Sequence, residues 1–247
     1  MDRRELFFEV HTGETREGPG SPESTRKAFS YISGIDKNSK VIDIGCGPGW
    51  QTLELARLCG GEITAIDLHE PFLDILKTSA LKAGYGNRLT ARKMSMTEID
   101  FPDGAFDLVW SEGAIYFIGF TRGLKEFRRL LKTGGYLAVS EATWLKPNPP
   151  DEVKEFWNRE YPAMGTLESN LASIDYHEYE IAGYFVLPPS DWEEYFSPLK
   201  ARFEQMLARH PGDPDAEEYY REELHEFAMY DKYREFYGYV FYILKAI

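Results

Sequence analysis

The sequence predicts an α/β fold in which a mostly parallel β-sheet is covered by helices on both faces. Short apolar strand patterns alternate with amphipathic helix patterns through residues 40–144, as is typical of parallel sheets. The strands lack the apolar–polar alternation of a sheet with one wet face, which indicates burial on both sides. A glycine-rich loop, GCGPG at residues 45–49, joins the first of these strands to the next helix.

Strand and helix signals occur in turn along this part of the chain. Ser21 as N-cap and Pro22 at the first helical position predict a helix over residues 21–32. Thr121 is predicted to cap a later helix whose carboxyl end carries glycines. The predicted helices after the first are residues 50–59, 71–84 and 121–135. The predicted strands are residues 40–44, 62–67, 88–94, 105–111 and 136–144.

The character of the chain changes after Trp144, where the proline-rich segment LKPNPPD ends the alternation. We predict an N-terminal helical lid segment over residues 1–34 and a main domain over residues 35–247. Within this domain we expect a helical insertion at about 145–180 and an acidic helical stretch at about 190–236, whose tyrosines should be core residues. The alternative for the tyrosine-rich part is a cation–π contact with a methylated amine. The predicted elements after the break are helices at 151–162 and 166–177 and strands at 184–188 and 236–247.

The chain is acidic, with a net charge of −13 over its 247 residues. Residues 1–145 carry a net charge of −2, and residues 146–247 carry −11. Because phosphate binding requires a basic face, we expect neither nucleic acid nor an anionic membrane surface as a partner. The first residues lack the apolar core of a secretory signal, and the two cysteines have no metal-binding neighbours. We therefore expect a reduced, cytoplasmic protein without a metal site.

The glycine loop narrows the choice of ligand. A dinucleotide-binding loop has glycine at its first, third and sixth positions, which here are Gly45, Gly47 and Trp50. A triphosphate-binding loop is excluded because no Gly-Lys-Ser/Thr follows. The loop therefore favours a ligand that approaches the backbone closely and has no pyrophosphate. S-Adenosylmethionine fits, since loop carbonyls, and Asp43 through a water molecule, can serve its ammonium group and the helix N-terminus can serve its carboxylate.

An acidic residue stands at the end of the second predicted strand. Asp67 follows Gly49 by 18 positions and is placed to hold two ribose hydroxyl groups. Leu68 beside it can pack on the face of an adenine ring. The alternative is that Asp67 caps the helix that follows.

Four segments resemble the class I S-adenosylmethionine-dependent methyltransferases, and within them the ubiquinone/menaquinone-type small-molecule group. They are VIDIGCGPG, ITAIDL, MSMTEIDFPDGAFDLVWSEGAIYFI and LLKTGGYLAVSE, in this order within residues 25–145. The resemblance implies a Rossmann-like sheet of seven strands in the order 3-2-1-4-5-7-6, with strand 7 antiparallel and a helical cap. It also implies S-adenosylmethionine as cofactor, S-adenosylhomocysteine as product and a small-molecule methyl acceptor.

The resemblance also assigns residues to the cofactor. Ser95 and Met96 should meet the adenine edge, although many relatives carry an acid where Met96 stands. Ser111, Glu112 and Gly113 should face the sulfonium and the acceptor. The full set of expected cofactor-binding residues is Arg16, Gly18, Asp43, Gly45, Cys46, Gly47, Gly49, Gln51, Asp67, Leu68, Ser95, Met96, Ser111, Glu112 and Gly113.

Methyl transfer is an in-line displacement with a neutral leaving group, so proximity and orientation can supply much of the acceleration. A base is needed only if the acceptor must lose a proton. Glu112 and Tyr116 are the catalytic candidates. The alternative for Glu112 is a structural hydrogen bond to loop amides, and the alternative for Tyr116 is simple packing. Arg16 is either a clamp on a carboxylate or a solvated side chain. We expect His11 and His177 to lie at the surface.

Other functions stay open at this stage. A nicotinamide-dependent oxidoreductase is disfavoured by Trp50. A protein methyltransferase and a catalytically silent S-adenosylmethionine-binding regulator remain alternatives. We expect a monomer or homodimer and substrate contacts from the segment at about 145–180. The acceptor atom, whether O, N, S or C, does not follow from the sequence.

Overall fold

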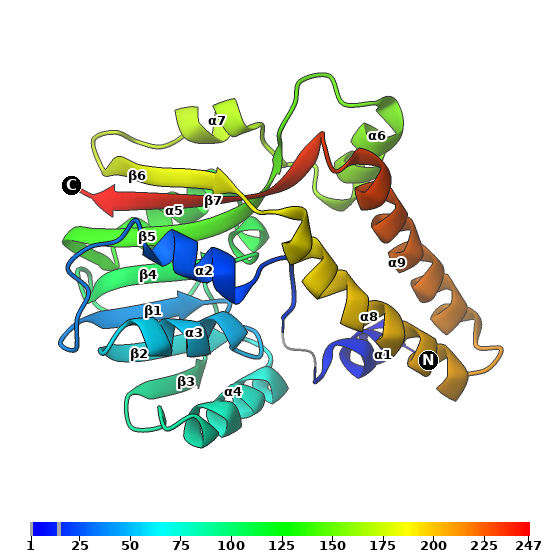
Figure 1. Ribbon diagram of the computed structural model, residues 1–247, viewed down its shortest axis with the longest axis horizontal. Coiled ribbons are helices and arrows are strands. Elements are labelled where there is room, and N and C mark those ends of the chain that lie inside the picture. Colours follow the sequence, from blue (N-terminus) through cyan, green and yellow to red (C-terminus); the bar gives the residue numbers. More distant parts are fainter. Residues whose placement is uncertain (1, 14–15) are drawn as a thin grey trace.

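The computed structural model describes residues 2–13 and 16–247 and contains one seven-stranded β-sheet (Figure 1). Its strand order, β3-β2-β1-β4-β5-β7-β6, confirms the predicted topology. Strands β1 to β5 run parallel to one another, whereas β7 pairs antiparallel with both β5 and β6. The strands are β1 (Lys40–Ile44), β2 (Glu62–Asp67), β3 (Leu89–Lys93), β4 (Phe106–Glu112), β5 (Leu131–Trp144), β6 (Tyr179–Val186) and β7 (Tyr237–Ala246).

Both faces of the sheet are buried, as the continuous apolar strands predicted. Adjacent residues of β1 point to opposite faces, so Val41 belongs to one apolar core and Ile42 to the other. The first core is completed by α2 (Pro22–Phe29), α3 (Trp50–Leu58) and α4 (Glu70–Lys82). The second is completed by α5 (Phe120–Arg128) and α7 (Leu167–Ala172). A short 3₁₀ helix, η1 (Ile115–Phe117), follows β4.

Four helices form a separate unit beside the carboxyl ends of the parallel strands, and we call it the helical lobe (Figure 1). They are α1 (Arg3–His11), α6 (Asp151–Glu160), α8 (Pro189–Arg209) and α9 (Pro214–Tyr233). The lobe has its own apolar core, in which Tyr219, Tyr230 and Tyr233 are buried as predicted for the tyrosine-rich stretch. Arg202 of α8 donates hydrogen bonds to backbone carbonyls at the end of α1 and so joins distant parts of the chain.

Several boundaries differ from the prediction. Helix α5 ends at Arg128, and the segment predicted as its last turns is the beginning of β5. The register between β4 and β5 shifts there, and Gly134, at φ +81°, lies within the shifted part. The N-cap residue of α5 is Gly119, whereas Thr121, the predicted N-cap, lies inside the helix. The stretch at 190–236 is a helical hairpin, because Gly212 turns the chain at φ +76° between α8 and α9.

The predicted segments at the N-terminus and at 145–180 each contribute to two parts of the structure. In the N-terminal segment, α1 joins the lobe while α2 packs on the sheet. Residues 1, 14 and 15 of this segment lie outside the described part. In the second, α6 joins the lobe while α7 packs beside β6 and α5. Within the described ranges, no helix combines the length and apolar character needed to cross a bilayer.

Candidate functional site

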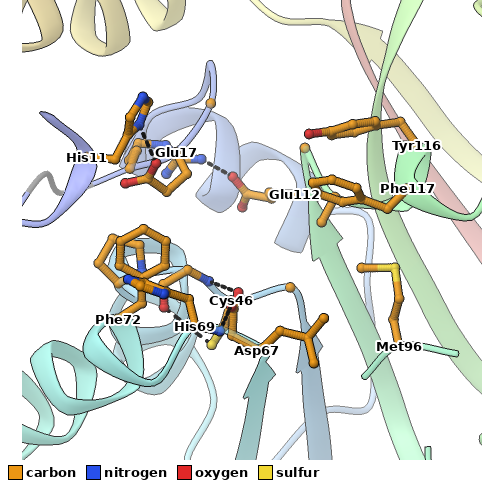
Figure 2. A pocket seen from close by; sticks show the side chains of 18 of the residues that line it. His11, Glu17, Cys46, Asp67, His69, Phe72, Met96, Glu112, Tyr116 and Phe117 are labelled. Carbon is orange, nitrogen blue, oxygen red and sulfur yellow. Dashed lines mark hydrogen bonds and ion pairs between the residues drawn. The ribbon is translucent and has the colours of Figure 1, made fainter. Parts of the chain in front are cut away.

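A cavity of about 470 Å³ lies where β1, β2 and β4 end, between the sheet and the helical lobe (Figure 2). Parallel strands bring their carboxyl ends to one edge of the sheet, which is where such folds bind ligands. Phe7, Phe8 and His11 of α1 close the cavity from the lobe side. All the expected cofactor-binding residues except Asp43, Gly49 and Ser111 line it.

Two glycines of the loop are required by close contacts. Gly45 has φ +71°, and a methyl group added to it would lie 2.4 Å from Cβ of Ala114. Gly49 has φ +88°, and an added methyl group would lie 2.3 Å from Leu76 of α4. The first glycine therefore lets the loops after β1 and β4 meet in the cavity wall, and the second lets α3 approach α4.

Replacing Gly45 with alanine should lower the free energy of unfolding by about 2–4 kcal/mol, because left-handed strain and a steric clash add. Gly104→Ala is the matched control: its φ is +65°, and an added methyl group would meet nothing within 4 Å. It should lose only about 1–2 kcal/mol. Urea unfolding of both variants measures the difference. Equal losses of stability would show that the close contact with Ala114 does not contribute to the cost of Gly45→Ala.

Asp67 ties the glycine loop to the end of β2. Its Oδ2 accepts a hydrogen bond from the Gly47 amide at 2.9 Å, and its Oδ1 accepts one from the His69 amide at 2.8 Å. Because His69 is the N-cap residue of α4, the second bond is close to the helix-capping role that was the alternative for Asp67. Asp67 nevertheless lines the cavity together with Leu68, whose side chain is 62% exposed. Each carboxylate oxygen keeps a further lone pair for a ligand.

Asp43 lies behind the glycine loop and not on the cavity wall. The side chain is fully buried, and Oδ2 accepts a hydrogen bond from the Thr52 hydroxyl at 2.6 Å. Oδ1 has no hydrogen-bond partner within the described residues. Burial raises the pKa of this carboxyl to about 7. Ser111 is also buried, and its hydroxyl donates to the Ile44 carbonyl at 2.9 Å, so it ties β4 to β1.

The stability of the ligand-free protein should fall as the pH rises from about 4 to about 7. An unfolded aspartate loses its proton near pH 3.9, whereas folded Asp43 keeps it up to a pKa of about 7. The folded state therefore binds more protons in this window, and each such group contributes up to about 1.4 kcal/mol per pH unit. Glu141, whose pKa burial also raises to about 7, acts in the same direction.

Urea unfolding across that pH window measures this slope. The Asp43→Asn variant should show a shallower decline, because its amide accepts from Thr52 without titrating. A wild-type stability that increases toward neutral pH would contradict the assignment.

Arg16 and Glu112 both line the cavity and form a buried ion pair. Their side chains are 7% and 3% exposed, which excludes the solvated alternative for Arg16. Oε1 of Glu112 also accepts hydrogen bonds from the Thr25 hydroxyl at 2.8 Å and the Trp110 indole at 2.9 Å. Glu112 is thus held by three side-chain donors and not by the loop amides of its structural alternative. Nε and Nη1 of Arg16 have no hydrogen-bond partner within the described residues.

The prediction that His11 lies at the surface was wrong, because its side chain is only 4% exposed and lines the cavity. Its Nδ1 lies 2.6 Å from Oε2 of Glu17, and its ring stacks on Phe7. His177 is exposed, as predicted. The helical lobe brings His11 to this position, and no short sequence motif around residue 11 indicates that.

Sequence reasoning also missed His69, which lines the cavity beside Asp67. Its ring stacks on Phe8 of α1, with ring centres 3.9 Å apart, and so joins the lobe to the start of α4. The sequence did contain a signal for His69, since it lies two residues after Asp67, the last residue of the second strand. A lobe residue as its partner could not be anticipated from that spacing.

Tyr116 and Phe117 stand on the side of the cavity opposite His11 and Glu17 (Figure 2). Tyr116 is 36% exposed, stacks on Phe117 and meets Tyr161 edge-on. Burial raises the pKa of its hydroxyl to about 12, so it stays protonated at neutral pH. It therefore lies in the cavity wall and is not a fully packed core residue.

Comparison with known proteins gives a family for this architecture. Residues 42–139 match a family model described as a methyltransferase domain. A S-adenosylmethionine-dependent methyltransferase from Thiobacillus denitrificans, solved with S-adenosylhomocysteine, has a TM-score of 0.85, covers 98% of both chains and is 21% identical. Over residues 42–139 the chain is therefore similar to methyltransferase domains, and its fold is that of the solved methyltransferase.

Sequence relatives of the methyltransferase domain act on different compounds by their names. A sterol 24-C-methyltransferase from Yarrowia lipolytica is 32% identical over 125 residues, which are 50% of this chain and 32% of that protein. The ubiquinone/menaquinone biosynthesis C-methyltransferase UbiE from Hahella chejuensis is 28% identical over 176 residues, 70% of this chain and 68% of that one. The match thus spans about a third of the length of the first curated relatives.

The remaining expected residues have distinct places in the methyltransferase domain. Gln51 lines the cavity and donates from its side chain to the Cys46 carbonyl at 2.9 Å, which stiffens the glycine loop. Ser95 and Met96 line the cavity, and the Ser95 hydroxyl lies 2.8 Å from that of Thr97. The Gly113 amide donates to the Ser140 hydroxyl at 2.9 Å. Within the described residues, no cluster of His, Cys, Asp and Glu has metal-binding geometry.

Proposed function

We propose that this protein is a S-adenosylmethionine-dependent methyltransferase that acts on a small-molecule acceptor. The observation that carries the proposal is the composition of one cavity wall. Asp67 and the side-chain-free positions Gly45 and Gly47 line the cavity, and so does Arg16, two of whose donors have no hydrogen-bond partner within the described residues. A ribose diol matches the carboxylate, and a carboxylate group matches the guanidinium donors.

The cofactor would supply an electrophilic methyl group on a sulfonium with a neutral leaving group. The residues of this chain would bind and orient it. Asp67 would hold the ribose, and Leu68, Ser95 and Met96 would surround the adenine. Arg16, positioned by Glu112, would face the carboxylate. Because Glu112 is already held by three donors, we propose that it positions Arg16 rather than removing a proton.

The wall favours this cofactor over a nicotinamide dinucleotide. Trp50 occupies the sixth loop position, is 42% exposed and does not line the cavity. The backbone at that position therefore lacks the glycine by which a dinucleotide-binding helix packs on its strand. Calorimetry with S-adenosylmethionine, S-adenosylhomocysteine and NAD⁺ tests the choice. We expect binding of the first two, and binding of NAD⁺ alone would overturn the proposal.

Transfer itself is tested with methyl-labelled S-adenosylmethionine and host cell extract, separated by size after incubation. We expect label in the small-molecule fraction. Label on protein alone would favour a protein methyltransferase, and cofactor binding without transfer to any fraction would favour a silent regulator. The acidic chain supports neither nucleic acid nor an anionic membrane as partner. We also propose a cytoplasmic monomer or homodimer.

A further inference from the structure

A second cavity of about 200 Å³ adjoins the first and extends beneath the helical lobe. The two cavities share a boundary formed by Glu17, Gly18, Pro19, Gly113, Tyr116 and Tyr195. This boundary includes Gly113, which follows Glu112, the partner of Arg16. Because Arg16 is assigned above to the cofactor carboxylate, a molecule in the second cavity would meet the amino-acid end of the cofactor, which the sulfonium joins to the ribose.

Aromatic rings dominate the wall of this second cavity. They come from the loop after β4, the end of α6, α8 and β7, and they are Tyr116, Trp157, Tyr161, Trp192, Tyr195 and Tyr239. Tyr116 meets Tyr161 edge-on with ring centres 5.8 Å apart, and Trp192 lies 5.6 Å from Tyr239. Such a group of π faces attracts an organic cation more strongly than a neutral molecule of the same shape.

The same wall contains acidic side chains and, within the described residues, no basic ones. Glu17, Glu160 and Glu226 line the cavity, and none of its lining residues within the described chain is Lys, Arg or His. Glu17 pairs with His11, and Glu160 pairs with Arg159 at the rim. Glu226 of α9 has no hydrogen bond or ion pair within the described residues. One carboxylate therefore lacks a positive partner in a wall that provides none.

The surroundings of Glu226 show the same deficit of positive charge. Burial raises its pKa to about 8, and the charges of Glu223 and Glu160 add to this rise, so Glu226 is mostly protonated at neutral pH in the empty cavity. A cation bound beside it would favour the ionised form, which can then accept a proton. Glu141 lies behind Tyr161, whose hydroxyl donates to Oε1 at 2.5 Å, while Oε2 has no partner within the described part of the chain. A bound cation would offset the unfavourable burial of both carboxylates.

The wall also offers a polar donor. Trp192 is 2% exposed, and its indole N–H has no hydrogen-bond acceptor within the described residues. A hydrocarbon in the cavity would leave this donor unpaired, whereas an oxygen-bearing ligand would satisfy it. The cavity is therefore better suited to a small polar cation than to an apolar chain or ring.

We propose that the second cavity binds an organic ammonium ion and that the methyl acceptor is its amine nitrogen, an inference that rests on the methyltransferase function proposed above. The ammonium group passes one proton to the Glu226 carboxylate. The freed nitrogen lone pair forms the new N–C bond while the S–C bond breaks, and the sulfur keeps that electron pair. The product is a methylated ammonium ion, held by the same rings until release.

Calorimetry on the protein saturated with S-adenosylhomocysteine tests the binding step. Choline is the cationic probe, and 3,3-dimethylbutan-1-ol is its neutral isostere. We expect choline to bind at least tenfold more tightly, and Glu226→Gln to reduce that preference at least tenfold without changing the affinity for S-adenosylhomocysteine. Glu218→Gln removes the same charge from an exposed position of α9 and should leave the preference intact.

The outcomes separate the two proposals. Failure to bind S-adenosylhomocysteine would overturn the methyltransferase function. Binding of S-adenosylhomocysteine with no preference for choline, or an equal loss in both glutamate variants, would overturn the ammonium site alone. In the labelling experiment, small-molecule label should be retained by a cation exchanger at acid pH after charcoal removes the cofactor. Label recovered only in neutral or anionic products would also overturn the inference.

Discussion

Replacing Glu112 with alanine is expected to lower the free energy of unfolding by about 3–5 kcal/mol, the cost typical of breaking a buried ion pair from one side. Arg16 would keep its charge in a place where its side chain is 7% exposed. The Thr25 hydroxyl and the Trp110 indole would each lose an acceptor. Urea unfolding with and without S-adenosylhomocysteine measures the loss, and the variant should also bind that ligand weakly.

Two further variants distinguish this pair from an ordinary surface contact. Glu126→Ala removes a carboxylate that faces Arg122 across one turn of α5 at 3.9 Å, with both side chains exposed, and should change stability by less than about 1 kcal/mol. The double variant Arg16→Met/Glu112→Leu removes both charges and should recover much of the lost stability. It should not recover ligand binding if Arg16 faces the carboxylate of the cofactor. A Glu112→Ala loss as small as that of Glu126→Ala would contradict the assignment.

Asp67→Ala should weaken the binding of S-adenosylhomocysteine at least tenfold. Hydrogen bonds to a charged group contribute about 1.5–3 kcal/mol, and a tenfold change corresponds to about 1.4 kcal/mol. The substitution also frees the Gly47 and His69 amides, so thermal unfolding must accompany the calorimetry to separate affinity from stability. Asp74→Ala, at an exposed position of α4, is the matched control and should bind normally. Unchanged affinity in Asp67→Ala would refute its role at the ribose.

The sheet and the glycine loop could be predicted from the sequence because their determinants are local. Strand β1 is a short apolar run, and the glycine-rich loop follows it directly in the sequence. The end of α5 was predicted too late, because the register shift opposite β4 takes residues 131–135 into the sheet. Helix propensity and capping residues are local features, so they do not predict that these residues pair with β4.

The parts of the site that come from the lobe were beyond sequence reasoning. His11, Tyr195 and Glu226 reach the two cavities only because α1, α8 and α9 pack together, and they are far apart in the chain. A tyrosine-rich acidic helix predicts a buried aromatic face, and most of its tyrosines are indeed core residues. The same pattern does not indicate which ring faces a cavity, since that depends on the angle between packed helices.

The position of β7 has a consequence for the order in which the chain can fold during its synthesis. Strand β7 follows all other elements in sequence but lies between β5 and β6 in the sheet. While a ribosome is still making residues 237–246, β5 and β6 have both emerged without their shared neighbour, and each presents an unpaired edge. A stalled or truncated nascent chain would therefore expose two apolar strand edges, which makes it a substrate for chaperones and prone to self-association.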